Sequence, residues 1–413
     1  GEALLLFTFD NANVRLEFYQ QAREYYDPRS EFYQQTQPYF EKKYGIDSAH
    51  FHINASHSES SPDTYVDPEK CPEIIAYNEL VNRQIIAAGE EAIRDLRPAS
   101  LEYGTTYTWD LNFVKHAFLD TGVAIGDNHG RRSDGRILQH TSQVDNAMLA
   151  IKILREGVPD LVLVNWRGHN QFTSGGTKLD ISADYVGAFR DAAKAKLGCD
   201  LMFFQGCAGN VNPYSYIREE ERTRDYHEFG KFLTEHLCDL YHKMTPIAAG
   251  KIRAEQVSVS AKTNHAEDHK LEEARHVWDF FEYGHEKEEC RNEALKYGFR
   301  SVYHAGSVIR KKFSPPTYEY PISVFAVGDL AFASVEFEIF DNLGAFVREN
   351  SPYAHTFVLG YTDHAATYMP NAYAYEYGAY EAETALVDIG SGERCAAVML
   401  ERLIHMKYHY GEE

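Results

Sequence analysis

The chain is short of basic residues. Its 413 residues contain 41 Lys and Arg against 62 Asp and Glu, which gives a formal net charge of −21. Nucleic acids and anionic membranes bind basic surfaces, so neither is expected as the main partner. Long apolar runs are also lacking: none approaches the roughly 20 residues that a membrane-spanning helix needs, so no transmembrane segment is predicted.

Cysteine is scarce as well. The six cysteines are scattered, none forms a C-x-x-C pair, and they lie at Cys71, Cys199, Cys207, Cys238, Cys290 and Cys395. A disulfide framework or a zinc ribbon is therefore not expected, and the thiols are interpreted as reduced. Scattered, reduced cysteines slightly favour a cytoplasmic location for the protein. The sequence begins at Gly1 without Met, however, so a missing N-terminal segment, and with it secretion, stays open.

Short apolar runs alternate with amphipathic segments, which predicts an α/β fold. Expected strands are 3–9, 49–53, 102–114, 161–164, 200–204, 251–260, 322–327, 330–335 and 353–359. Expected helices are 72–97, 185–197, 219–243 and 393–407, whereas 147–154 fits either a strand or a helix. We expect a mixed, largely parallel central sheet flanked by helices, with the active site in loops at the strand ends. Without repeats or low-complexity linkers, residues 1–413 are predicted to form a single domain, with a charged helical excursion at about 264–312.

Polar side chains follow several of these strands. His57 and Glu59 come after 49–53, and they project to one side of an extended backbone because side-chain direction alternates. His169 follows 161–164, and Glu338 follows the hairpin 322–335. The carboxyl ends of strands are where open α/β sheets usually hold their active sites. Each segment taken alone can also be a polar loop.

Two histidines and a carboxylate fit a catalytic zinc site, which takes three or four protein ligands and keeps one position for water. With 19 histidines in the chain, some histidines at strand ends are expected by coincidence. A Gly-rich loop, 205–213, follows the strand 200–204, and its missing side chains let backbone N–H groups approach a ligand.

Six segments carry a family resemblance, in this order: NASHSESSP (54–62), RRSDGR (131–136), NWRGHNQFTS (165–174), FFQGCAGNVNP (203–213), VEFEIFDNLG (335–344) and GYTDHAATYMPNAYAYEYGAYEAET (360–384). Together they resemble the motifs of the neutral/alkaline (non-lysosomal) ceramidases, zinc-dependent amidohydrolases of N-acylsphingosines. The chain looks like a divergent, bacterial-type relative of the N-terminal catalytic domain of that family, without its C-terminal β-rich domain.

The resemblance implies a Zn²⁺ cofactor with four ligands: His57, His169, Glu338 and Tyr368. It also implies that Arg132, or its neighbour Arg131, contacts the reacting carbonyl. Tyr380 matches a tyrosine that stabilises the oxyanion, a role that suits a phenolic donor because the tetrahedral intermediate concentrates negative charge on one oxygen.

Three positions inside the matching segments differ from the family, and one of them is Asn210, where the family has Asp. Glu59 stands where ceramidases have a second histidine, and Asn212 stands where they have the serine implicated in catalysis. Loss of the serine removes an acyl-enzyme route through that residue but not attack by metal-activated water. Glu59 is interpreted either as the base for that water or as a carboxylate that orients a ligand histidine. Asn212 is interpreted as a substrate contact or as part of the loop structure.

The leading hypothesis is a zinc-dependent hydrolase that cleaves the amide bond of a small N-acyl substrate. Specificity for ceramide is not expected, because the loops are rich in Tyr, Asn, Asp and Arg. The alternatives are a zinc-dependent esterase or deacetylase that acts on a polar or carbohydrate-like acylated molecule, and a non-catalytic binding protein on the same scaffold. The oligomeric state stays open.

Overall fold

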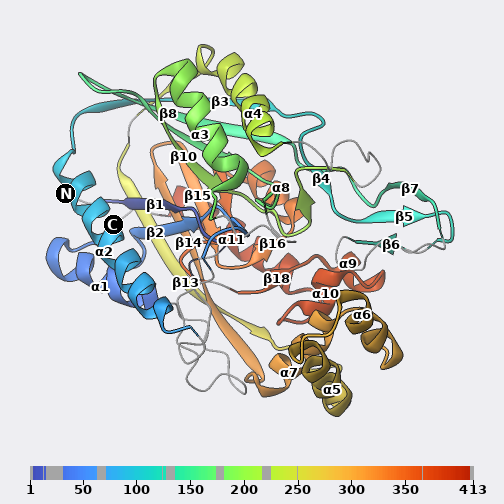
Figure 1. Ribbon diagram of the computed structural model, residues 1–413. Helices are drawn as coiled ribbons and strands as arrows, with labels where there is room; N and C mark the ends of the chain where they lie inside the picture. Colours follow the sequence, from blue (N-terminus) through green and yellow to red (C-terminus); the bar gives the residue numbers. More distant parts are fainter. Residues whose placement is uncertain are drawn as a thin grey trace.

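The computed structural model describes residues 3–12, 14, 31–62, 71–122, 124–126, 135–173, 181–215, 225–248, 250–364 and 366–409. Helices and mixed sheets alternate along these residues (Figure 1), so the predicted α/β class is confirmed.

One sheet has five strands, and its middle strand contains residues 147–154, which the sequence left open between strand and helix. The strand order is β10 (Asp200–Gln205), β9 (Leu161–Trp166), β8 (Ala147–Arg155), β3 (Ala99–Tyr107) and β12 (Thr245–Ile247). Only β10 and β9 are parallel, and the other three pairs are antiparallel.

A second sheet has four strands, in the order β13 (Ile252–Lys262), β14 (Thr317–Val327), β15 (Leu330–Val335) and β17 (His355–Leu359). The expected hairpin of β14 and β15 is confirmed, and only β15 and β17 pair in parallel. The prediction of a largely parallel sheet is therefore wrong. Short connections such as 328–329 and 156–160 join antiparallel neighbours, whereas parallel strands need longer crossovers.

The two sheets pack face to face, because alternate residues along each strand point to opposite sides. In β9, Leu163 faces the other sheet, while Val162 and Val164 face the helices α3 (Asp184–Leu197) and α4 (Tyr226–Tyr241). On the other sheet, helices α8 (Asp341–Asn350) and α11 (Ser391–Tyr408) cover the outer face. The result is a four-layer arrangement of helices, sheet, sheet and helices (Figure 1).

A parallel pair, β1 (Leu5–Phe9) and β2 (Phe51–Ala55), extends beside β10 and is covered by α1 (Glu31–Tyr44) and α2 (Glu73–Arg94). The Asn54 side chain joins β2 to β10: its Oδ1 accepts from the Gln205 backbone N–H at 2.7 Å, and its Nδ2 donates to the Gln205 carbonyl at 3.3 Å. This connection holds the carboxyl end of β2 near those of β10 and β9.

The segment predicted as a charged helical excursion, at about 264–312, is helical from 268 to 313 except for short connections. It contains η3 (Asp268–Lys270), α5 (Leu271–Glu282), α6 (Lys287–Lys296) and α7 (Val302–Phe313). These helices enclose a small apolar cluster of their own, which includes Val277, Ala294 and Phe299. The shorter elements are β4 (Phe113–Val114), β5 (Ala117–Leu119), β6 (Ala124–Ile125), β7 (Ile137–His140), β11 (Val211–Asn212), β16 (Glu338–Ile339), β18 (Tyr368–Met369), α9 (Ala372–Glu376) and α10 (Tyr380–Thr384).

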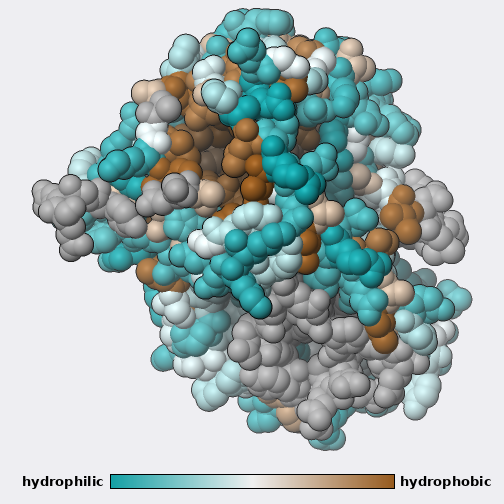
Figure 2. Space-filling view, turned by 90° about the vertical axis from the view of Figure 1, so that its left-hand side faces the viewer, coloured by the Kyte–Doolittle hydropathy of each residue, from teal (hydrophilic) through white to brown (hydrophobic). Residues whose placement is uncertain are grey.

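The face in Figure 2 is mostly hydrophilic, in keeping with the acidic composition, and it has apolar side chains gathered in a hollow in its upper half. Among the described residues, none of the helices is both long enough and apolar enough to cross a membrane.

Candidate metal centre

Two of the predicted loops meet directly. His57 follows β2 and His169 follows β9, and a parallel bridge between Ser58 and Asn170 joins the two segments. The Glu59 backbone N–H also donates to the Asn170 carbonyl at 3.1 Å. The two histidine rings lie edge to face, with centroids 4.8 Å apart.

Glu338 enters from the other half of the chain. It lies in β16, which pairs in parallel with β18 so that Glu338 stands opposite Tyr368. The Gly-rich loop holds this segment in place, because the Gly209 N–H donates to the Ile339 carbonyl at 3.0 Å. The backbones approach so closely here that a Cβ on Gly209 would lie 2.2 Å from the Glu338 carbonyl oxygen. Only glycine fits at position 209.

Both histidines present the same ring nitrogen to Glu338. The Nδ1 of His57 lies 2.6 Å from the Ala12 carbonyl, and the Nδ1 of His169 lies 3.1 Å from the Val211 carbonyl. Since a carbonyl only accepts, each Nδ1 must carry the proton, which leaves a lone pair on each Nε2 of the neutral rings. Glu338 Oε2 lies 3.4 Å from both Nε2 atoms.

This spacing fits a metal ion. Two ligand atoms that are each about 2.0–2.1 Å from a tetrahedral zinc ion lie about 3.3–3.4 Å from each other. The residues therefore offer two imidazole nitrogens and a carboxylate oxygen with the separation and chemistry that zinc prefers. The carbonyl partners fix the ring orientations, as is usual for metal-binding histidines.

Glu59 is also close. A carboxylate oxygen of Glu59, a nitrogen of His57 and a nitrogen of His169 all lie within 4.8 Å of one another. Glu59 is exposed, unlike the two buried histidines. Its position at the solvent side suits proton exchange with water and also allows it to act as a further ligand.

The electrostatics favour an ionised Glu338 and lower the pKa of His169. Burial opposes ionisation of Glu338, but His57 and His169 hold the pKa of this carboxyl below its usual value. Burial, together with the positive charge of Lys115, lowers the pKa of His169. Burial and the nearby Glu338 raise the pKa of Tyr368 well above 10, so in this environment Tyr368 is a neutral phenol.

The loops around the cluster hold an unusual backbone conformation. His57, Tyr361 and Asp363 all have positive φ angles, of 60°, 51° and 70°. Such conformations cost of order 1–3 kcal/mol each outside glycine and tend to gather at functional sites. The Tyr361 ring packs on His57 with centroids 4.4 Å apart, and its hydroxyl donates to Glu338 Oε2 at 3.3 Å.

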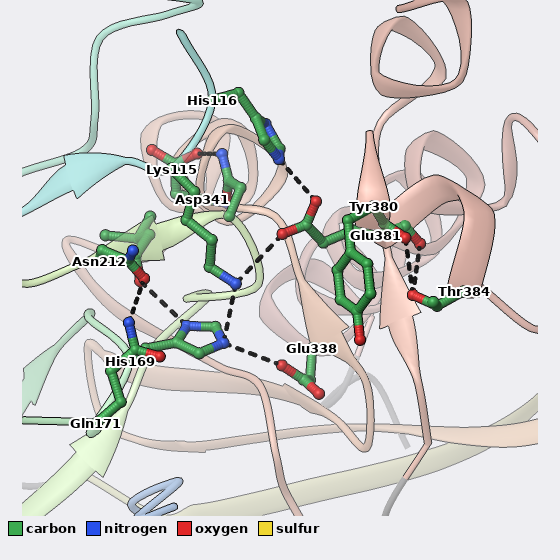
Figure 3. A network of polar contacts seen from close by, with 12 residues as sticks. Lys115, His116, His169, Gln171, Asn212, Glu338, Asp341, Tyr380, Glu381 and Thr384 are labelled. Carbon is green, nitrogen blue, oxygen red and sulfur yellow. Dashed lines mark hydrogen bonds and ion pairs between the residues drawn. The ribbon is translucent and has the colours of Figure 1, made fainter. Parts of the chain in front are cut away.

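The remaining predicted residues surround this cluster or lie outside the described residues. Tyr380 packs against Tyr368, with ring centroids 5.9 Å apart, and its hydroxyl points toward the side where Glu338 lies (Figure 3). Asn212 accepts a hydrogen bond from Gln171 at 2.9 Å and directly follows the carbonyl that orients His169. The two alternatives for the site arginine, Arg131 and Arg132, fall in the part of the chain that the structure does not describe.

A buried charged group that is not among the predicted site residues lies beside the candidate metal ligands. Lys115 Nζ lies 3.1 Å from His169 Nε2 and 3.3 Å from Glu381 Oε1, and His116 Nε2 lies 2.7 Å from Glu381 Oε2 (Figure 3). All three side chains are at most 3% exposed. A sequence signal existed: Lys115 and His116 are the only ionisable residues in the apolar run 113–119.

The fold and the cluster define an α/β protein with a candidate metal centre at the ends of its strands. Two solved structures share this fold, each with a TM-score of 0.67 over 98% of this chain. One is the neutral ceramidase from Pseudomonas aeruginosa, which is 14% identical in sequence; the match covers 66% of that chain. The other is described as a ceramidase complexed with C2, which is 13% identical; the match covers 67% of that chain. The chain thus has a neutral-ceramidase-like fold and spans about two thirds of those chains.

At this identity the likeness shows the fold alone. No protein-family model matches the sequence, and no similar curated protein was found. The organisation of residues 1–413 as one catalytic domain stays a prediction, as do the roles of the site residues.

Proposed function

We propose that this protein is a zinc-dependent hydrolase that cleaves the amide bond of a small N-acyl substrate. The observation that carries the proposal is the position of Glu338 Oε2, 3.4 Å from the Nε2 atoms of both His57 and His169. The fold that the chain shares with two ceramidase structures supports an acylated amide as the substrate class.

His57, His169 and Glu338 would hold the zinc ion, with Tyr368 beside them. Bound zinc would lower the pKa of a coordinated water and polarise the substrate carbonyl. The neutral phenol of Tyr368 loses its proton only if the positive charge of the ion offsets burial and the neighbouring Glu338. We therefore expect Tyr368 to contribute less to zinc affinity than either histidine.

Proton transfer is assigned to Glu59. Its carboxylate is exposed and near both histidines, so it can take a proton from the attacking water and return it to the leaving amine. Tyr380 can donate a hydrogen bond to the oxyanion, because burial raises the pKa of its hydroxyl and keeps its proton in place. Asn212 would contact the substrate, and Arg132 or Arg131 stays the predicted carbonyl contact.

The test is hydrolysis of a matched panel of N-acyl amides and O-acyl esters by metal-depleted and zinc-loaded protein. We expect zinc-dependent cleavage of amides, and loss of cleavage in His57→Ala. Zinc-loaded protein that cleaves only the esters would assign the esterase function instead. Zinc binding with no cleavage in the panel would favour the binding protein.

Glu59→Gln separates the two interpretations of Glu59. As a general base, its loss should reduce turnover by about 10²–10⁴-fold while zinc stays bound. Loss of zinc in this variant would instead make Glu59 a ligand. Full activity would exclude both roles.

A further inference from the structure

Lys115 is buried at the point where a metal ion would bind. It lies between β4 and β5, its side chain is 3% exposed, and its Nζ is 3.1 Å from His169 Nε2. The same Nζ is 5.2 Å from the centre of the Tyr368 ring. Figure 3 shows the ammonium between His169 and Glu381, with Glu338 on the other side of the imidazole nitrogen.

The contact with His169 uses the lone pair that a metal ion needs. The Nδ1–H of His169 is committed to the Val211 carbonyl, so Nε2 can only accept, and the Lys115 ammonium can only donate. A single Nε2 lone pair cannot bind an ammonium hydrogen and a metal ion together. Lys115 must therefore leave His169 when a metal ion binds there.

Lys115 is also held in place by its surroundings. Its backbone N–H donates to the Asn210 carbonyl at 2.8 Å, and its ammonium pairs with Glu381. Glu381 is fixed in turn by His116, whose Nδ1 lies 2.7 Å from the Tyr377 hydroxyl. The ammonium can turn away from His169 toward Glu381, but its charge stays close to the metal ligands.

We infer that Lys115 is an internal cation that competes with the metal ion for His169 and thereby lowers the metal affinity of the site. This inference rests on the proposed zinc site. Two effects act in the same direction: the hydrogen bond to Nε2 must break, and a positive charge remains near a divalent ion. A charge-assisted hydrogen bond alone accounts for a change of about tenfold or more in affinity.

The competition also predicts opposite effects on the metal-free and metal-bound protein. Without metal, the Lys115 ammonium offsets the buried negative charges of Glu338 and Glu381, so its removal destabilises the fold. With metal, the ion supplies that positive charge, so removal of Lys115 strengthens binding. If Lys115 had only a structural role, its removal would destabilise the metal-free protein and would also weaken metal binding.

The experiment measures zinc affinity by competition with a chelating dye for wild type, Lys115→Met and Lys115→Met/Glu381→Gln. The double variant removes the carboxylate that Lys115→Met leaves available as an extra ligand. Lys152→Met is the matched control, because Lys152 is another buried lysine with a carboxylate partner, Glu102, and has no contact with the cluster among the interactions described. Melting temperatures with and without zinc provide a second measurement.

We expect both variants that lack Lys115 to bind zinc at least about tenfold more tightly than wild type, with lower melting temperatures without zinc. Lys152→Met should keep wild-type affinity. Tighter binding in the single variant alone would assign the effect to Glu381 and overturn the inference. If wild type binds zinc and both variants bind it equally or more weakly, only this inference fails; if none of them binds zinc, the proposed function fails as well.

Discussion

Gly209 offers a test of how strictly the backbone sets the position of Glu338. A Cβ at residue 209 would lie 2.2 Å from the Glu338 carbonyl oxygen, whereas Cβ contacts below 3.0 Å are essentially never found. Gly209→Ala therefore forces a displacement of about 0.8 Å or more between the Gly-rich loop and β16. Metal ligand distances vary by only about 0.2 Å, so this movement is several times larger than the site can accept.

We expect Gly209→Ala to weaken zinc binding at least about 100-fold, because even partners that only orient a ligand account for about 10–100-fold. The free energy of unfolding, measured in denaturant, should fall by about 1–3 kcal/mol because the added methyl group overpacks this region. The control is Gly187→Ala in α3, where the new Cβ meets only the Ala183 side chain, at 3.0 Å, and alanine favours the helix. Zinc affinity within threefold of wild type in Gly209→Ala would show that the contact between residue 209 and Glu338 does not set the geometry of the site.

Three further predictions concern residues around the site and in the helical excursion. Glu381→Ala leaves the buried Lys115 ammonium unpaired, so we expect a loss of about 3–5 kcal/mol in chemical unfolding, and a loss below about 1 kcal/mol would contradict this. A hydrogen bond from His304 lowers the pKa of Glu267 from 4.5 to about 2, so its stabilisation is complete above pH 4.5 and disappears as the pH falls toward 2. After allowance for the partial exposure of Glu267, its ionisation contributes about 1–2 kcal/mol to the free energy of unfolding. Glu267→Gln should remove this part of the acid dependence of unfolding. An unchanged dependence on pH would exclude the contribution. Asn212→Ala should stay folded and keep zinc but lose about tenfold in turnover, and full activity on a good substrate would exclude a substrate contact.

The α/β class and most element types could be predicted from local pattern. The hairpin of β14 and β15 follows from two apolar runs joined by Gly328 and Asp329, and α4 follows from apolar residues at helical spacing. The strand pairing could not be read in this way, because the order of strands depends on contacts far apart in the sequence. The expectation of a largely parallel sheet failed for that reason.

The site shows the same division. His57, His169 and Glu338 each follow a strand, so their meeting could be predicted. The structure places Glu338 Oε2 3.4 Å from the Nε2 atom of each histidine. The prediction of Tyr368 depended on the family resemblance. Its pairing with Glu338 in two-residue strands, which distinguishes it from the neighbouring tyrosines, is visible only in the structure. Lys115 was missed because its partner Glu381 is 266 residues away in the sequence.

We propose that His57, His169 and Glu338 together bind one zinc ion. The most direct measurement is the zinc content of purified protein by elemental analysis, after metal removal, incubation with zinc and dialysis. The comparison includes wild type, His57→Ala, His169→Ala and the control His236→Ala, whose imidazole lies in α4. We expect one zinc ion per chain in wild type and the control, and almost none in the other two variants. A wild-type protein that stays metal-free, or equal zinc in all four proteins, would contradict it.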